Sequence, residues 1–160
     1  MNKKDLFNQI ILELESIVDN AKNAANRAHH TATDKENISQ TRYDTLALEG
    51  AYLAQGQAAR ATEAKAELRL FKNLSFIEFS NQSPITMGAL VILERRESNR
   101  QIVFIGPSAG GLKLIFSDRE ILVITPLSPL GNALLGRMVD DEFEIITGNK
   151  KNEYTILEVY

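Results

Sequence analysis

The first part of the chain carries apolar residues at alternating steps of three and four between Asp5 and His30. This spacing is a heptad a/d pattern, which predicts a helix that packs along a partner helix as a coiled coil. The members of this predicted seam are Phe7, Ile10, Leu14, Ile17, Ala21, Ala24 and Ala28. Because the side chains shrink towards alanine, we expect the two helices to come closer together near the end of this segment.

A second helical segment, residues 36–73, predicts the partner helix. Its small residues come first and its large residues last, in the order Ala47, Ala51, Ala54, Ala58, Leu68 and Phe71. In an antiparallel hairpin the sizes of the facing side chains therefore match along the whole length. Gly50 and Gly56 each cost about 1 kcal/mol relative to alanine inside a helix, so we expect them to mark close helix approach. Arms of roughly 26 to 36 residues predict a narrow rod about 40–50 Å long.

The polar turn between these helices, residues 31–41, contains Asp34 and Glu36 at the far end of the rod. Thr33 or Asp34 fits the N-cap of the second helix, with Glu36 close enough to accept a first-turn amide hydrogen bond. Two exposed carboxylates cannot hold Mg²⁺ tightly by themselves, because the ion requires an octahedral oxygen shell. They can complete the shell of a Mg²⁺ that another protein already holds in part. The residues alone leave capping and metal contact open.

After Pro84 the pattern of apolar residues changes from helical to strand-like. Six strands are predicted, at residues 89–93, 101–105, 112–116, 121–124, 142–146 and 154–159. Ser128 or Pro129 begins a short helix that Gly136 ends. The chain is therefore predicted to be α+β, with a long antiparallel coiled-coil hairpin in residues 1–74 and a small antiparallel β domain in residues 75–160.

The core of that small domain is predicted to be modest, because the domain has only about 75 residues and no disulfide. We expect it to gain apolar contacts from the base of the hairpin. The residues expected to supply them are Phe71, Leu74, Phe76 and Phe79.

Charge and composition limit the kind of partner. Ten basic and ten acidic residues precede Ser75, and eight basic and eleven acidic residues make up the rest. A protein that binds duplex DNA by itself needs a basic excess, so we expect a protein partner.

There is no cysteine, which excludes disulfides and thiolate metal sites. No apolar run approaches the roughly 18 residues that a membrane span needs. Gln9, Glu13 and Glu15 interrupt the apolar patch near the start, which argues against a signal peptide. We expect a cytoplasmic monomer without a cofactor of its own.

Three other patterns argue against a conventional enzyme. The segment GPSAGGLK at residues 106–113 is close to a phosphate-binding loop, but its lysine comes one place late and a strand follows instead of a helix. A glycine-rich hairpin turn explains it better. His29 and His30 are neighbours and point about 100° apart on a helix, unlike an i, i+4 pair of metal ligands. No G-x-S-x-G nucleophile elbow is present.

Three segments near the end of the chain carry a specific pattern: ITPLSPLGNALLG at residues 124–136, DDEFEI at 140–145 and YTILEV at 154–159. They read as a strand, a Ser-Pro that begins a short helix, and two closing strands. This pattern resembles the bacterial GreA/GreB transcript-cleavage factors, and residues 87–92 (MGALVI) resemble the opening strand of their C-terminal domain. The resemblance extends over nearly the full length of the chain.

The resemblance implies an FKBP-like C-terminal domain that grips the rim of the RNA polymerase secondary channel. It also implies a coiled coil that passes down this channel to the active centre, near the 3′ end of the nascent RNA. The loop that carries Thr125, Pro126, Ser128 and Pro129 would make the rim contact.

In the family, an Asp and a Glu three places further on coordinate the catalytic Mg²⁺ of the polymerase during cleavage of backtracked RNA. The sequence here is TDKEN at residues 33–37, and alignment on Lys-Glu-Asn or on Tyr43 leaves one carboxylate out of register. Asp34 and Glu36 are the candidate catalytic and metal-contacting residues, and they would share the Mg²⁺ only inside the polymerase.

Two alternatives remain open. One is a regulator that occupies the same channel without stimulating cleavage, as other members of the wider family do. The other is a prolyl isomerase or chaperone, suggested by a coiled coil beside an FKBP-like fold. An isomerase needs an apolar pocket lined by aromatic residues, and the C-terminal part has no tryptophan and few aromatic residues.

Overall fold

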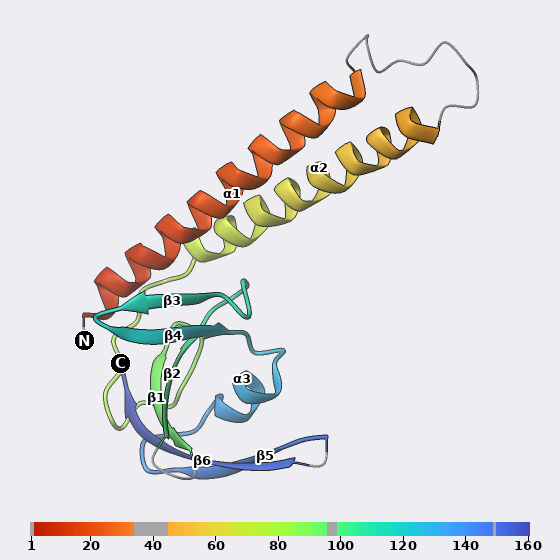
Figure 1. Cartoon of the computed structure of the whole chain (residues 1–160). Coiled ribbons are helices and arrows are strands. Elements are labelled where there is room, and N and C mark those ends of the chain that lie inside the picture. The colour runs from red at the N-terminus through yellow and green to blue at the C-terminus, as the bar shows by residue number, and fades with distance from the viewer. Residues whose placement is uncertain (1, 34–44, 96–98, 149) are drawn as a thin grey trace. The chain divides into compact units, whose positions relative to one another are not determined.

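The computed structural model describes residues 2–33, 45–95, 99–148 and 150–160 (Figure 1). Its elements are α1 (Lys3–Thr33), α2 (Thr45–Lys72), β1 (Leu90–Arg95), β2 (Asn99–Ile105), β3 (Lys113–Phe116), β4 (Arg119–Ile124), α3 (Pro129–Leu134), β5 (Glu142–Thr147) and β6 (Lys150–Val159). The predicted α+β class is confirmed. Each predicted strand and the predicted short helix are present, with bounds that differ by a few residues.

By contacts, the chain divides into two compact units. One unit is Ile11–Arg69, and the other combines Met1–Ile10 with Leu70–Tyr160. The start of α1 and the end of α2 therefore belong to the same unit as the sheet. The predicted boundary between a hairpin in residues 1–74 and a β domain in residues 75–160 stays a prediction.

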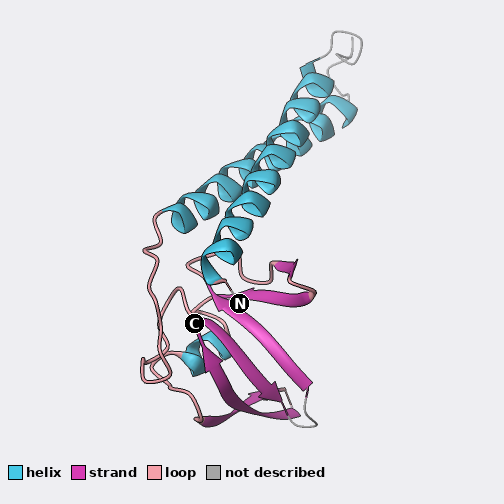
Figure 2. Ribbon diagram, turned by 90° about the vertical axis from the view of Figure 1, so that its left-hand side faces the viewer, coloured by secondary structure: helices cyan, strands magenta, loops and turns pink. Residues whose placement is uncertain are grey.

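Within the unit Ile11–Arg69, α1 and α2 run side by side in opposite directions (Figures 1 and 2). Leu14 and Val18 of α1 and Ala61 and Ala64 of α2 are buried in this unit. The helices have 31 and 28 residues, which corresponds to lengths of about 46 and 42 Å. None of the described helices is long and apolar enough to cross a membrane.

The predicted heptad register of α1 is wrong at two positions. The buried apolar residues of the helix are spaced by four and are Leu6, Ile10, Leu14 and Val18. Phe7 is only partly buried, and Ile17 is 36% exposed. Each step of four advances about 40° around a helix with 3.6 residues per turn, so the buried stripe drifts away from a strict heptad seam.

The predicted seam of α2 also needs correction. Ala51 and Ala58 are exposed, whereas Ala61 and Ala64 are buried. A Cβ atom built on Gly56 meets no other atom within 4 Å, so this glycine does not mark a close approach of the helices. The predicted first turns of this helix, residues 36–44, lie outside the described residues.

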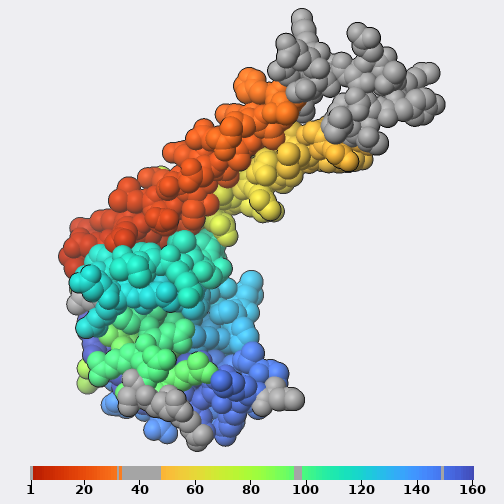
Figure 3. Space-filling model, viewed as in Figure 1, coloured from red at the N-terminus to blue at the C-terminus, as the bar shows by residue number. Residues whose placement is uncertain are grey.

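The six strands form one sheet in the order β3-β4-β2-β1-β6-β5. In the space-filling view the surface of this unit passes from the β3–β4 hairpin through β2 to the β5–β6 hairpin (Figure 3). Four neighbouring pairs are antiparallel, but β2 and β4 are parallel. The prediction of a wholly antiparallel sheet is therefore wrong for one pair.

The connection between β2 and β3 explains the parallel pair. Residues 106–112 do not form the predicted hairpin turn, because β3 pairs with β4 and not with β2. The Gly111 amide donates to the Val123 carbonyl at 2.9 Å, and the Val123 amide donates to the Leu112 carbonyl at 2.8 Å. The chain thus passes to the edge of the sheet first, and β4 returns beside β2 in the same direction.

The two faces of the sheet pack against different elements. On one face, strand residues such as Val91, Val103 and Ile156 form a core with Leu134 of α3. The opposite face carries Phe104, because side chains alternate along a strand. These two faces hold the base of the helices and α3 on opposite sides of one sheet.

Phe104 is the contact point for the helix base. Its ring centroid lies 6.3 Å from that of Phe7 and 6.2 Å from that of Phe71. A Cβ atom on Gly106 would lie 2.5 Å from Phe71 Cζ, so an alanine there would require the buried Phe71 ring to shift. Of the residues predicted to supply the domain with apolar contacts, Phe71 is fully buried, Leu74 and Phe79 are partly buried, and Phe76 is exposed.

Candidate functional site

The loop between β4 and α3 (residues 125–128, the β4–α3 loop) is held by hydrogen bonds of Ser128. The Ser128 amide and hydroxyl both donate to the Thr125 carbonyl, at 3.0 and 2.8 Å. The same hydroxyl oxygen accepts a hydrogen bond from the Gly131 amide at 3.0 Å, which makes Ser128 the N-cap of α3. Pro129 stands in the first turn, where its missing N–H costs nothing. The predicted helix start at Ser128-Pro129 is confirmed.

Two glycines allow the chain to approach this loop closely. A Cβ atom on Gly131 would lie 2.0 Å from the Thr125 carbonyl oxygen, a distance at which the backbone would have to move. A Cβ atom on Gly110 would lie 3.2 Å from Thr125 Cγ2. Residues 106–112 and the β4–α3 loop are therefore neighbours, and Thr125 is fixed from both sides.

This fixed loop presents one apolar side chain to solvent. Leu127 is 96% exposed, whereas Thr125, Pro126 and Ser128 are partly buried. An exposed leucine on a hydrogen-bonded loop needs little reordering if it binds a partner. The predicted rim-contact residues Thr125, Pro126, Ser128 and Pro129 lie on this loop and at the start of α3, and Leu127 lies among them. Their contact with a partner stays a prediction.

The glycine-rich segment beside the loop has few amides free for a phosphate. The Gly106 amide donates to the Ile124 carbonyl at 2.8 Å, and the Leu112 amide donates to the Ala109 carbonyl at 3.1 Å. The Gly111 amide is also used by β4. A strand, β3, follows this segment, so the helix N-terminus that a phosphate-binding loop requires is missing there.

The tip acids Asp34 and Glu36 lie outside the described residues, so their metal contact stays a prediction. His29 and His30, at the end of α1, are exposed. Within residues 2–33, 45–95, 99–148 and 150–160, no three acidic or histidine side chains are placed to bind one metal ion.

A surface pocket surrounds Lys3 at the start of α1. The Lys3 side chain is only 8% exposed, and its ammonium group donates to the Ile77 carbonyl. The Nζ atom lies 4.3 Å from the centre of the Phe79 ring and 5.1 Å from that of Phe76. Burial lowers the pKa of Lys3 to about 8, and the charge of Glu78 opposes this shift. These contacts tie the first turn of α1 to the segment before β1, which is a structural role.

The lowered pKa of Lys3 predicts a pH dependence of stability. The unfolded chain keeps this proton up to about pH 10.5, whereas the folded chain loses it near pH 8. The unfolded state therefore binds more protons between these values, and the free energy of unfolding rises with pH across this window. We expect a gain of about 1–3 kcal/mol between pH 8 and pH 10 in urea denaturation.

A methionine at position 3 serves as the test, because it keeps the apolar stem and removes the titrating group. The Lys3→Met variant should lose this rise, and Lys4→Met, at an exposed neighbouring lysine, should keep it. An equal rise in the Lys3→Met protein and the unaltered chain would show that Lys3 is not the group responsible.

Sequence reasoning did not single out the exposed Leu127. One signal for it exists in the sequence: Leu127 stands between Pro126 and Ser128-Pro129, so it belongs to neither a strand nor a helix pattern. A large apolar residue in such a segment has no core position assigned by periodicity. Its exposure could not be read from the sequence, because loop residues can also turn inward.

Comparison with known proteins gives one family. The sequence profile described as "Transcription elongation factor, GreA/GreB, C-term" matches residues 80–160, which include the whole sheet, the β4–α3 loop and α3. No curated protein sequence matches the chain.

Several solved structures are similar to the chain. The GreA factor homolog 1 (Gfh1) protein of Thermus thermophilus is 18% identical, with 94% of each chain covered and a TM-score of 0.39. Gfh1 of Thermus aquaticus is 21% identical, with 92% of each chain covered and a TM-score of 0.41. The GreA/GreB factor of Nitrosomonas europaea is 23% identical over 62% of this chain and 78% of that one, with a TM-score of 0.37. TM-scores below 0.5 support no closer comparison.

Proposed function

Because the chain belongs to the GreA/GreB family of transcription elongation factors, we propose that it binds RNA polymerase and acts on elongation complexes through the secondary channel. The C-terminal domain would hold the rim of the channel with the β4–α3 loop. The helical hairpin would enter the channel and bring Asp34 and Glu36 to the active centre.

The observation that best supports polymerase binding is the exposed Leu127 on a loop fixed by Ser128 and Gly131. The loop lies inside the segment that matches the family. Its backbone is held by three hydrogen bonds of Ser128 at 2.8–3.0 Å. A loop that is already ordered loses little conformational entropy when it binds, so its contacts contribute more fully to affinity.

The hairpin supports the second half of the proposal. Two antiparallel helices of 31 and 28 residues, each about 42–46 Å long, are thin enough to enter a channel too narrow for a globular domain. The carboxylates of Asp34 and Glu36 would supply oxygen ligands to a Mg²⁺ that the polymerase holds. The ion would activate water for cleavage of the RNA phosphodiester, so the chemistry belongs to the polymerase and the chain is an accessory factor.

A second candidate function follows from the tip sequence. In TDKEN at residues 33–37 the two carboxylates are two places apart, where the family pattern has three. A carboxylate out of register would leave the channel occupied and the metal shell incomplete. The chain would then regulate the polymerase without stimulating cleavage.

Replacing Leu127 with alanine tests the proposed rim contact. We expect binding to core RNA polymerase to weaken about 10-fold, because a central apolar anchor is lost while the loop keeps its hydrogen bonds. Fluorescence anisotropy of the labelled full chain, titrated with polymerase, measures the dissociation constant. The melting temperature should not change, since Leu127 is almost fully exposed.

Ile146→Ala is the matched control, because Ile146 is also apolar and 69% exposed but lies on β5. It should bind the polymerase as the unaltered chain does. Equal affinities for the Leu127→Ala and Ile146→Ala proteins would place the contact elsewhere. No binding by the unaltered chain would contradict the proposed function itself.

A further inference from the structure

A pocket on the sheet carries two arginines that have no ion-pair partner among the described residues. Its lining consists of Ile92, Arg100, Ile102, Arg119 and Glu120, and its volume is about 390 Å³. The pocket lies on the face that also carries Phe104, because Arg100, Ile102 and Phe104 alternate along β2. The helix base contacts this face at Phe104. Towards the start of β2 this face changes from apolar, at Phe104, to basic, at Arg100.

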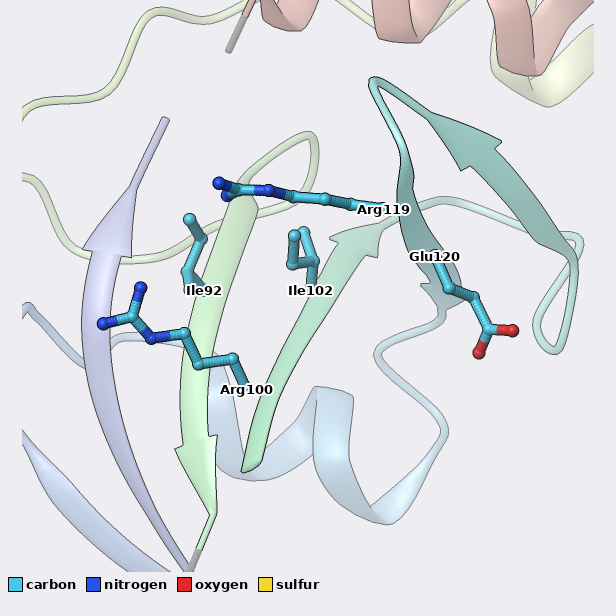
Figure 4. Close-up of a pocket in the computed structure, with 5 residues that line it drawn as sticks. All are labelled: Ile92, Arg100, Ile102, Arg119 and Glu120. Atoms are coloured by element: carbon cyan, nitrogen blue, oxygen red, sulfur yellow. The ribbon is translucent and has the colours of Figure 1, made fainter. Parts of the chain in front are cut away.

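The strand register places the two arginines on the same face of the sheet. Ile102 is paired with Ile121 in the parallel β2–β4 ladder, so Arg100 and Arg119 stand two residues earlier on neighbouring strands and on the same face. Both side chains extend over β1 towards β6 (Figure 4). The parallel pairing, which the sequence did not predict, is the cause of this arrangement.

Three carboxylates stand near the arginines: Glu120 lines the pocket, Glu94 is paired with Arg100, and Glu158 is paired with Ile92. The Glu120 side chain points away from the two guanidinium groups (Figure 4), and it forms an ion pair with Lys113 at 3.0 Å. Glu158, opposite Ile92 on β6, accepts a hydrogen bond from the Tyr160 hydroxyl. Among the described residues, neither arginine makes an ion pair with a carboxylate.

The floor of the pocket is apolar. Ile92 and Ile102 are both buried, with exposed fractions of 4% and 7%. An occupant that has an oxyanion next to an aliphatic group would place its charge on the guanidinium groups and its apolar part on the two isoleucines. Arginine suits this role, because its planar fork binds a carboxylate through two parallel hydrogen bonds.

The surroundings distinguish a single carboxylate from a polyanion. Glu94 faces Arg100 across the β1–β2 pair, and Glu158 stands on the other side of β1. A nucleic-acid backbone with phosphates in succession would pass these carboxylates and be repelled, whereas one acidic side chain needs only the space between the arginines. The net charge of the chain is also negative, −3, which does not favour nucleic acid.

We propose that the pocket formed by Arg100, Arg119, Ile92 and Ile102 is a second docking site on RNA polymerase, which receives an acidic side chain and a neighbouring aliphatic side chain of that enzyme. This inference rests on the proposed function, because it takes the polymerase as the partner. It adds a charge-dependent contact to the apolar contact at Leu127.

Charge reversal at both arginines tests the site. The variant Arg100→Glu/Arg119→Glu should bind core RNA polymerase on the order of 10- to 100-fold more weakly than the unaltered chain. Arg100→Lys/Arg119→Lys keeps the charge but loses bidentate hydrogen bonding to a carboxylate. Its affinity should therefore lie between that of the unaltered chain and that of the charge-reversed variant. The affinity of the unaltered chain should fall as salt rises from 50 to 300 mM, and that of the charge-reversed protein should change less.

Lys4→Glu/Lys150→Glu is the matched control, because it changes the net charge equally at two exposed lysines outside the pocket. It should retain the affinity of the unaltered chain.

Equal weakening by both double variants would show a general charge effect and overturn the docking site. Undiminished binding of Arg100→Glu/Arg119→Glu would overturn it while leaving the proposed function intact, and no binding by the unaltered chain would overturn both. Binding of single-stranded RNA that depends on the arginines, without any effect on polymerase binding, would also overturn it.

Discussion

Replacing Asp34 and Glu36 together with alanine is expected to reduce RNA cleavage in backtracked elongation complexes by about 100-fold, to the level of the polymerase alone. The two carboxylates are the only part of the proposed mechanism that would contact the metal. Their loss removes ligands without changing the C-terminal domain, so the dissociation constant for polymerase should stay within about threefold. The readout is the length of end-labelled RNA against time, with polymerase saturated by the factor.

Asp44→Ala/Glu49→Ala is the control for this experiment, since it removes the same charge from positions further along the chain from the tip. This protein should stimulate cleavage as the unaltered chain does. Cleavage by the Asp34→Ala/Glu36→Ala protein at the unaltered rate would reject the role assigned to both acids. Loss of binding in the same protein would instead show that the tip contributes to affinity.

Gly131→Ala is expected to have the largest effect on stability. The added methyl group would lie 2.0 Å from the Thr125 carbonyl oxygen, which already accepts two hydrogen bonds from Ser128. The loop would have to move, and the Thr125 carbonyl would lose its hydrogen-bond partners. We expect a loss of about 3 kcal/mol, equivalent to a fall of about 10–20 °C in the melting of a unit of this size.

The same substitution should also weaken polymerase binding about 10-fold or more below the melting temperature, because Leu127 is displaced with the loop. Gly56→Ala is the matched control, since the same methyl group meets nothing within 4 Å there and alanine favours the helix. Thermal unfolding followed by circular dichroism, together with the binding titration, gives both quantities. A Gly131→Ala protein as stable as the unaltered chain would show that the loop tolerates the displacement.

Local patterns in the sequence predicted the elements of this fold well. Alternating apolar residues located all six strands, and the Ser128-Pro129 pair located the start of α3. These features depend on neighbours within a few residues, so the sequence carries them directly. The exclusion of a phosphate-binding loop at residues 106–113 likewise depended on the strand pattern that follows it.

Features set by tertiary packing were not predicted. Both Ile17 and Val18 are apolar, and only packing decides that Val18 is buried and Ile17 exposed. The choice of β4 over β3 as the neighbour of β2 depends on the path of residues 106–112 through space. That choice also sets Arg100 beside Arg119, so the arginine pocket could not be inferred from two residues 19 positions apart in the sequence.

The most direct test of the central claim is the length of RNA in purified backtracked elongation complexes after addition of the full chain and Mg²⁺. The proposal predicts that the RNA is shortened from its 3′ end when the unaltered chain is added, and that the Asp34→Ala/Glu36→Ala protein binds equally well but leaves the RNA intact. RNA of unchanged length in complexes saturated with the unaltered chain would contradict cleavage stimulation.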